Sequence, residues 1–344
     1  MSTTEAPAPH SAAEQFELRR RSPLQRVQHL LHSYPAISPA LVLVIAYAVF
    51  SIANSRMATP NVTSLIIGQV AVIAALAVGQ TLIILTAGID LSVGAVSILS
   101  VAVMSKLASE EGVPAALALL LGIAVGGLAG LVNGVLVTRL NLPPFIVTLG
   151  TFSIFTALGL VYTKGRSINA ADMPDLLNWT DTTIELGEFR ITTGVLIVLA
   201  LFLVVGFALS QTAWGRHVYA VGDDAEGARL AGISVKRVLL SVYVVAGLIF
   251  GLTAWVLIGR AGAASPNSLI DANLQSITAV VIGGTSLFGG RGALIGTLLG
   301  ALIVGVFQTG LSLAGVDDQW RVLAVGVLII VAVSIDQWIR TVKS

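Results

Sequence analysis

The sequence is poor in charge and has no cysteine. Only 11% of its 344 residues are charged, against about 25% in a soluble domain, while 56% are hydrophobic. So few charges cannot cover a soluble enzyme or a disordered scaffold, and a net charge of +1 provides no field for nucleic acid. The lack of cysteine excludes disulfides, thiolate metal sites and cysteine nucleophiles.

Motifs for catalysis, cofactors and metals are equally scarce. The histidines, His10, His29, His32 and His217, are too scattered for a metal cluster, and no G-x-x-x-x-G-K-[ST] loop for nucleotide binding is present. We therefore expect no cofactor, no metal and no enzymatic activity in this chain. If ATP drives the protein, another chain must bind it.

Long apolar runs replace the missing charge. Ten windows contain no Asp, Glu, Lys or Arg, and most reach the ~17 to 25 residues of a membrane-crossing helix. They are 27–55, 57–89, 91–105, 112–138, 140–163, 191–215, 238–259, 272–290, 292–316 and 322–335. Because these runs do not alternate as membrane strands do, we predict an all-α, polytopic bundle of about ten transmembrane helices.

The charges between the windows predict an orientation. Basic residues favour the cytoplasmic side, and an arginine cluster precedes the first window within the polar segment 1–36. Alternation then places both termini in the cytoplasm. We expect 1–36 to be a cytoplasmic tail without a cleavable signal, either solvated or lying on the membrane surface, and 37–340 to be the membrane domain.

Two connecting segments are longer than a tight turn. Residues 164–190 are predicted to be external and to form a small cap. Residues 211–237 are predicted to be cytoplasmic, and 223–231 have helical composition, acidic at the start and basic toward the end. A short cytoplasmic helix is either a docking surface or an ordinary amphipathic connector, and composition alone favours the connector.

Glycines recur at every fourth residue in two windows. Small residues at this spacing let helices approach closely in lipid, where no hydrophobic effect drives association. We therefore interpret them as packing residues and not as phosphate-binding loops. They are Gly122, Gly126, Gly130 and Gly134 in one window and Gly292, Gly296 and Gly300 in another.

The windows predict two broken or re-entrant segments, at 86–94 and 281–293. In the first, Gly88 can end one helix, and Asp90 can cap the next by accepting the Val93 N–H, with Ser92 nearby. Asp90 could instead be an ion or proton site, but its neighbours favour the cap. One break in each half suggests a transporter with a weak internal repeat.

Four ordered blocks at these same places resemble a known family. The chain is similar to the permease subunit of bacterial ATP-binding cassette importers for monosaccharides, in the ribose, xylose and fructose transport group, and looks closest to its fructose/ribose branch. The blocks are Q-T-L-I-I-L-T-A-G-I-D-L-S-V-G-A (80–95), N-L-P-P-F-I-V-T-L-G-T (141–151), the stretch 215–238, and A-V-V-I-G-G-T-S-L-F-G-G-R-G-A (279–293).

The resemblance changes the interpretation of the cytoplasmic segment. It implies that residues 223–232 are the coupling helix that docks on an ATPase subunit. Those residues are Asp223, Asp224, Ala225, Glu226, Gly227, Ala228, Arg229, Leu230, Ala231 and Gly232. The acidic pair at 223 and 224 departs from the G-G-N that is frequent in the family, and Asn273-Leu274 departs from Glu-Leu.

The resemblance also implies a set of partners and a location. We expect a bacterial inner-membrane protein that works with an ATPase subunit, a periplasmic or lipid-anchored sugar-binding protein and a second permease copy, surrounded by lipid and not binding nucleic acid. Candidates for the sugar pathway lie near breaks or helix ends. They are Gln80, Asp90, Ser92, Asn133, Phe145, Thr148, Phe152 and Thr285.

Two other functions remain open at this point. An ion-coupled secondary transporter of a small polar solute would need an intramembrane ion-binding cluster, and none is visible in the sequence. A structural or regulatory membrane subunit would have no pathway at all.

Overall fold

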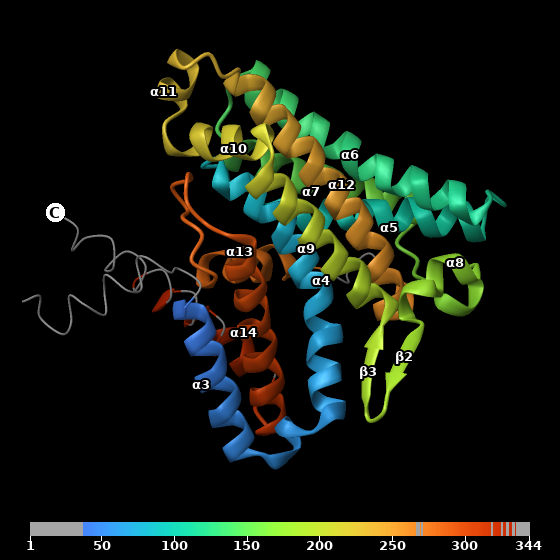
Figure 1. The fold of residues 1–344 in the computed structure, drawn as a ribbon. Helices are drawn as coiled ribbons and strands as arrows, with labels where there is room; N and C mark the ends of the chain where they lie inside the picture. The colour runs from blue at the N-terminus through green and yellow to red at the C-terminus, as the bar shows by residue number, and fades with distance from the viewer. Residues whose placement is uncertain are drawn as a thin grey trace, which may run out of the picture.

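The computed structural model describes residues 37–265, 269, 271–317, 319–324, 326, 327, 330, 331 and 334. The expected tail at 1–36 lies outside these residues, and the tenth apolar window is covered only in part. Figure 1 shows an elongated bundle of helices with α11 near one end and the β2–β3 hairpin toward the other.

The described chain is mostly helical, as predicted, with four short strands that the hydropathy pattern missed. In chain order the elements are α3 (Ile37–Ala53), η1 (Ser55–Ala58), α4 (Pro60–Leu85), α5 (Val93–Ser109), α6 (Ala115–Arg139), α7 (Pro144–Thr163), β1 (Ile168–Asn169), η2 (Ala170–Asp172), α8 (Asp175–Asn178), η3 (Trp179–Asp181), β2 (Thr183–Leu186), β3 (Phe189–Thr192), α9 (Thr193–Gln211), α10 (Ala213–Asp223), α11 (Ala225–Leu230), α12 (Val235–Ala261), β4 (Ala263–Ala264), α13 (Ala272–Ile282) and α14 (Leu294–Leu313).

Nine of the ten apolar windows contain a helix with described bounds, and the described residues of the tenth, 322–335, are helical as well. Six of these helices, α4, α6, α7, α9, α12 and α14, are long and apolar enough to cross a membrane. The other three, α3, α5 and α13, are apolar but have only 11 to 17 residues. Two of these three, α5 and α13, border the predicted breaks, one after the first break and the other before the second.

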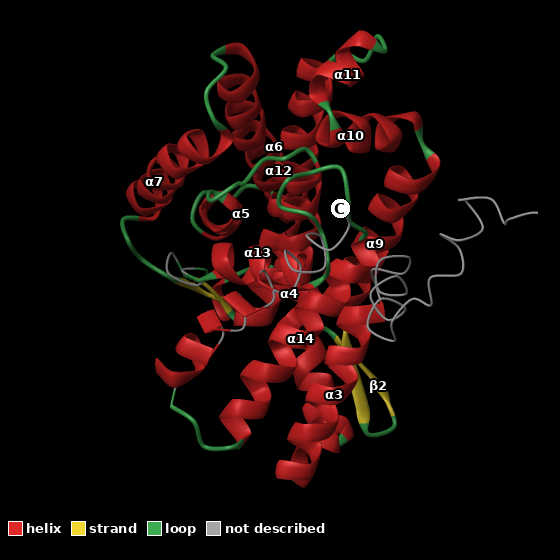
Figure 2. Cartoon of the chain, turned by 90° about the vertical axis from the view of Figure 1, so that its left-hand side faces the viewer, coloured by secondary structure: helices red, strands yellow, loops and turns green. Residues whose placement is uncertain are grey.

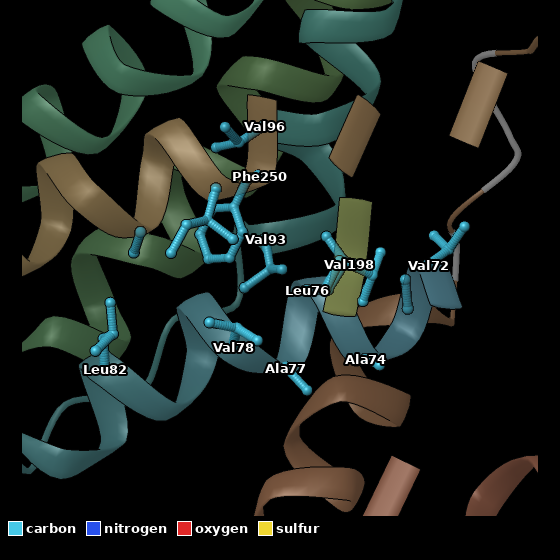
Figure 3. Close-up of a cluster of buried hydrophobic side chains, with 14 of the residues drawn as sticks. Val72, Ala74, Leu76, Ala77, Val78, Leu82, Val93, Val96, Val198 and Phe250 are labelled. Atoms are coloured by element: carbon cyan, nitrogen blue, oxygen red, sulfur yellow. The ribbon is translucent and has the colours of Figure 1, made fainter. Parts of the chain in front are cut away.

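Helix α4 forms the centre of the bundle. Thr59 caps its start, with Oγ1 accepting the Val62 N–H at 3.4 Å, and Pro60 occupies the first turn, where its missing N–H costs nothing. Every residue of α4 from Ala74 to Leu85 is buried. Side chains of α5, α9 and α12 meet this stretch (Figure 3), so α4 is buried on all sides here and is mostly apolar, as is typical of a helix enclosed by others.

Glycines allow α6 and α12 to touch along their backbones. A Cβ atom on Gly126 would lie 2.8 Å from the Gly251 Cα, and one on Gly130 would lie 3.1 Å from the Gly247 Cα. Gly296 and Gly300 of α14 pack in the same way against Gly283 and Ala279. This confirms the packing interpretation for these glycines, whereas Gly292 lies before α14, in the break.

The segment 164–190 folds against one end of α12. Strand β1 pairs with β4, and β2 and β3 form a hairpin. Trp179 stacks on Trp255 of α12 at 5.7 Å between ring centroids, and Trp255 Nε1 donates to the Leu176 carbonyl at 2.9 Å. The segment predicted to be a cap is thus fixed to α12 by aromatic packing and hydrogen bonds.

The segment 211–237 contains two helices instead of the one predicted at 223–231. Asp223 is the last residue of α10, and Asp224 is extended, with Oδ1 accepting the Glu226 N–H at 3.0 Å. An aspartate that caps a helix cannot also continue the preceding one, so the chain turns here. Both views place α10 and α11 together at one end of the molecule (Figures 1 and 2).

Candidate translocation site

The first break lies between α4 and α5 and is held by Asp90. Asp90 is buried, and its Oδ1 accepts hydrogen bonds from Ser92 N and Ser92 Oγ, both at 2.6 Å. Asn133 of α6 donates from Nδ2 to Ser92 Oγ at 2.9 Å. Three of the predicted pathway residues therefore form one buried hydrogen-bonded network.

The predicted cap on Val93 is wrong. The Asp90 carboxylate closes a local turn onto Ser92, two residues later, and this turn leaves it no bond to Val93 N. The first turn of α5 is instead satisfied from another helix, because Asn273 Oδ1 of α13 accepts the Gly94 N–H at 2.7 Å. In the sequence, Asn273 differs from the family pattern, but nothing there indicates this contact.

The end of α4 follows the prediction in part. Ala87, with φ 60°, adopts the left-handed conformation that is usually taken by a glycine at the end of a helix. Ala87 N donates to Ile84 O at 2.9 Å and Gly88 N donates to Ile83 O at 3.0 Å, which closes the last turn. Gly88 thus takes part in ending α4, as predicted, and it also leaves room for another helix, because a Cβ there would lie 3.3 Å from the Tyr243 hydroxyl oxygen.

Thr148 ties α7 to the same break. Its Oγ1 donates to Ile89 O and accepts the Leu91 N–H, each at 3.1 Å. The irregular backbone on either side of Asp90 is thus satisfied by a side chain from a third helix. Irregular backbone at membrane depth requires such partners.

The other four predicted pathway residues lie apart from this network. Gln80 of α4 and Thr285 of the second break are buried, and their side chains have no hydrogen-bond partner among the described residues. Phe145 is 49% exposed in the first turn of α7, and Phe152 packs partly buried against the core. No hydrogen bond among the described residues joins these four to one another or to the network.

Tyr243 of α12 is a residue that the sequence reasoning missed. It is 1% exposed, and its hydroxyl has no hydrogen-bond partner in the described chain. The hydroxyl lies beside Gly88 in the first break. A lone tyrosine in an apolar window carries no signal of this position, because the contact depends on how α12 crosses α4.

A cavity of about 860 Å³ opens at the end of α12 that is remote from α11. It lies between α4, α12, α13 and α14, and its apolar lining includes Leu65, Val72 and Leu257. None of the eight predicted pathway residues lines it. Its polar lining consists of Gln69, Arg260, Asp271, Gln275, Gln308, Thr309, Ser312 and Arg321.

Helix α11 presents an exposed, charged surface with one apolar side chain. Glu226 and Arg229 pair across one turn, with Arg229 Nε donating to Glu226 Oε2 at 2.9 Å, and this bond lowers the pKa of Glu226 and raises that of Arg229. Leu230 at the end of the helix is 76% exposed. An exposed leucine beside a fixed ion pair is suited to a protein contact.

The described residues contain no group of three histidine, aspartate or glutamate side chains that could hold a metal ion. Within the same part of the chain, the buried polar side chains around the first break carry amides, hydroxyls and one carboxylate. Such groups can hydrogen-bond to a hydroxylated solute as well as to the backbone of the break.

Comparisons with known proteins agree with this architecture. Residues 62–333 match the family described as branched-chain amino acid transport system / permease component. The chain is 48% identical to the fructose import permease of Rhizobium meliloti over 96% of this chain and 92% of that protein. It is 37% identical to the ribose import permease of Bacillus subtilis, over 88% and 92%, and 34% identical to the D-allose transport system permease of Escherichia coli, over 87% and 90%. No solved structure matches significantly.

Proposed function

The chain belongs to the branched-chain amino acid transport system / permease component family, and we propose that it carries a monosaccharide across the membrane as the permease of an ATP-binding cassette importer. The near-full-length similarity to sugar import permeases carries this proposal. Fructose is the first sugar to test, because the fructose import permease matches at 48% identity.

The geometry supports opposite roles for the two ends of α12. Its 27 residues span about 40 Å at 1.5 Å per residue, which exceeds the apolar thickness of a bilayer. The coupling segment 223–232, with α11 at its centre, precedes the start of α12, and the cavity lies at its end. We propose that α11 meets the ATPase subunit in the cytoplasm and that the cavity opens to the outside.

The cavity suits a monosaccharide that must be released again. The amides, hydroxyls and charged groups in its lining can hydrogen-bond sugar hydroxyls, while the apolar side chains between them contribute weak contact. A conduit needs weak binding, since a tight site would not release its cargo. A periplasmic or lipid-anchored binding protein would deliver the sugar here, and the cap segment 164–190 stands at the same end of α12.

The network of Asp90, Ser92 and Asn133 lies deeper, at the first break. We propose that these hydrogen bonds hold the first break in a closed arrangement. When the break moves, the sugar would pass beside this network. Gln80 and Thr285 are the other polar residues proposed for the pathway, because their buried side chains lack partners in the described chain. We also propose that the permease works together with a second permease copy and that both of its termini lie in the cytoplasm.

ATP-dependent uptake tests the function. The permease, its ATPase and its binding protein are reconstituted in liposomes, and labelled fructose, ribose and allose are supplied in turn. We expect one of these sugars to be taken up, and we expect its uptake to require both ATP and the binding protein. A proton or sodium gradient alone should drive no uptake. Uptake driven by an ion gradient without ATP would instead establish a secondary transporter.

Gln308→Leu tests the cavity. Gln308 of α14 lines it, and removing one hydrogen bond of about 0.5–1.5 kcal/mol should raise the KM of transport roughly 2- to 12-fold without changing retention of the ATPase. Gln211→Leu, at the exposed end of α9, is the matched control and should leave KM unchanged. An unchanged KM in Gln308→Leu would place the sugar elsewhere.

A further inference from the structure

The two broken segments touch each other beneath α10. Gly290 of the second break donates its N–H to the carbonyl of Leu85, the last residue of α4, at 2.9 Å. A Cβ on Gly289 would lie 2.8 Å from Ala87 N of the first break. The breaks, which belong to opposite halves of the chain, therefore share one backbone contact.

The end of α10 rests directly on this contact. A Cβ on Gly222 would press on the Leu85 carbonyl and lie 2.7 Å from Gly290 N. On the other side, a Cβ on Gly290 would lie 2.7 Å from the Asp223 Cα. Three segments thus meet through backbone atoms and the Cβ atoms of Ala87 and Asp223, none of which can rotate away to absorb a displacement.

Tyr219 adds a second link from α10. Its hydroxyl donates to the carbonyl of Gly292, in the second break, at 2.9 Å. The first turn of α10 is fixed separately, because Trp214 Nε1 donates to Ser241 Oγ of α12 at 2.8 Å. Helix α10 is therefore held at its start by α12 and along its second half by the breaks.

We propose that Gly222 and Tyr219 are positioning residues that transmit a displacement of α11 to both breaks as one unit. Only Asp224 separates α10 from α11, so a movement of α11 must turn or shift α10. A chain of rigid contacts can carry such coupling where each contact is direct. The proposal rests on the proposed function, in which α11 meets the ATPase.

The first test is Tyr219→Phe in the full complex reconstituted in liposomes. The substitution removes one hydroxyl and keeps the ring. We expect the number of sugar molecules moved per ATP hydrolysed to fall about threefold or more, while retention of the ATPase subunit stays unchanged. Tyr162→Phe is the matched control: it also loses a hydroxyl bond, to Glu111 at 3.2 Å, far from α10, and should keep the wild-type ratio.

The second test is Gly222→Ala, paired with Gly68→Ala. A methyl group at Gly222 must separate α10 from Leu85, whereas one at Gly68 meets nothing within 4 Å. In Gly222→Ala we expect ATP hydrolysis stimulated by the binding protein to persist while uptake falls at least tenfold. Gly68→Ala should retain both.

The outcomes separate the relay from the proposed function. If hydrolysis and uptake fall in the same proportion in both variants, the junction is only structural and the proposal is overturned. If Gly222→Ala yields no folded protein, Tyr219→Phe decides alone, and a wild-type ratio overturns the proposal. If the wild-type permease retains no ATPase, the proposed function itself fails.

Discussion

Leu230→Asp should abolish ATP-driven sugar uptake while leaving the amount of permease in the membrane unchanged. Leu230 is 76% exposed at the end of α11, so a carboxylate there disturbs no packing within this chain. In a contact with the ATPase, however, the same carboxylate would be buried without a partner, and an unpaired buried charge costs several kcal/mol. Retention of the ATPase subunit during purification of the permease measures the effect directly.

A matched leucine at the other end of the molecule provides the control. Leu186 in the β2–β3 hairpin is 60% exposed, and Leu186→Asp adds the same charge far from α11. This control should retain the ATPase at the wild-type level. If Leu230→Asp also retains it, α11 is not the docking surface, and the alternative of an ordinary connector between α10 and α12 stands.

Gly130→Ala should destabilise the permease strongly, because it separates α6 from α12. The new methyl group would collide with the carbonyl of Tyr243 and crowd Gly247, and both belong to the backbone of α12. Backbone cannot move aside as a side chain can, so the cost should reach or exceed the about 1–3 kcal/mol typical of overpacking. Thermal unfolding in detergent, followed by the loss of monodisperse protein, measures it.

The same substitution at an open glycine isolates the cause. A Cβ on Gly150 of α7 meets nothing within 4 Å, and Gly150→Ala should therefore unfold at or slightly above the wild-type temperature. If the two variants unfold at the same temperature, the close approach of α6 and α12 is not needed for stability. A lower unfolding temperature in Gly130→Ala alone would instead show that the glycine repeat is needed for helix packing.

Hydropathy located the helices and the breaks well. The windows predicted breaks at 86–94 and 281–293, and the structure interrupts the helices at 86–92 and 283–293. These signals are local, because a charge or a glycine cluster interrupts an apolar run whatever tertiary structure the chain adopts. The glycine spacing was informative for the same reason, since it marks one face of one helix.

The roles of residues within the breaks could not be read in this way. Asp90 was predicted to cap α5, yet Asn273, far along the chain, satisfies Gly94. Tyr243 and the cavity residue Gln308 carried no signal, because their importance depends on neighbouring helices. Among the predicted pathway residues, only those that share the first break were brought together.

The sequence by itself determined that this chain is a helical membrane protein with two interrupted helices and a charged segment between long spans. Apolar length and charge spacing are properties of consecutive residues, so they need no tertiary information. Only the tertiary structure decided that Leu85, Gly222 and Gly290 meet and that a polar-walled cavity lies at the far end of α12. Contacts between distant segments follow from how helices cross, and helix crossing depends on the fit of whole surfaces to one another.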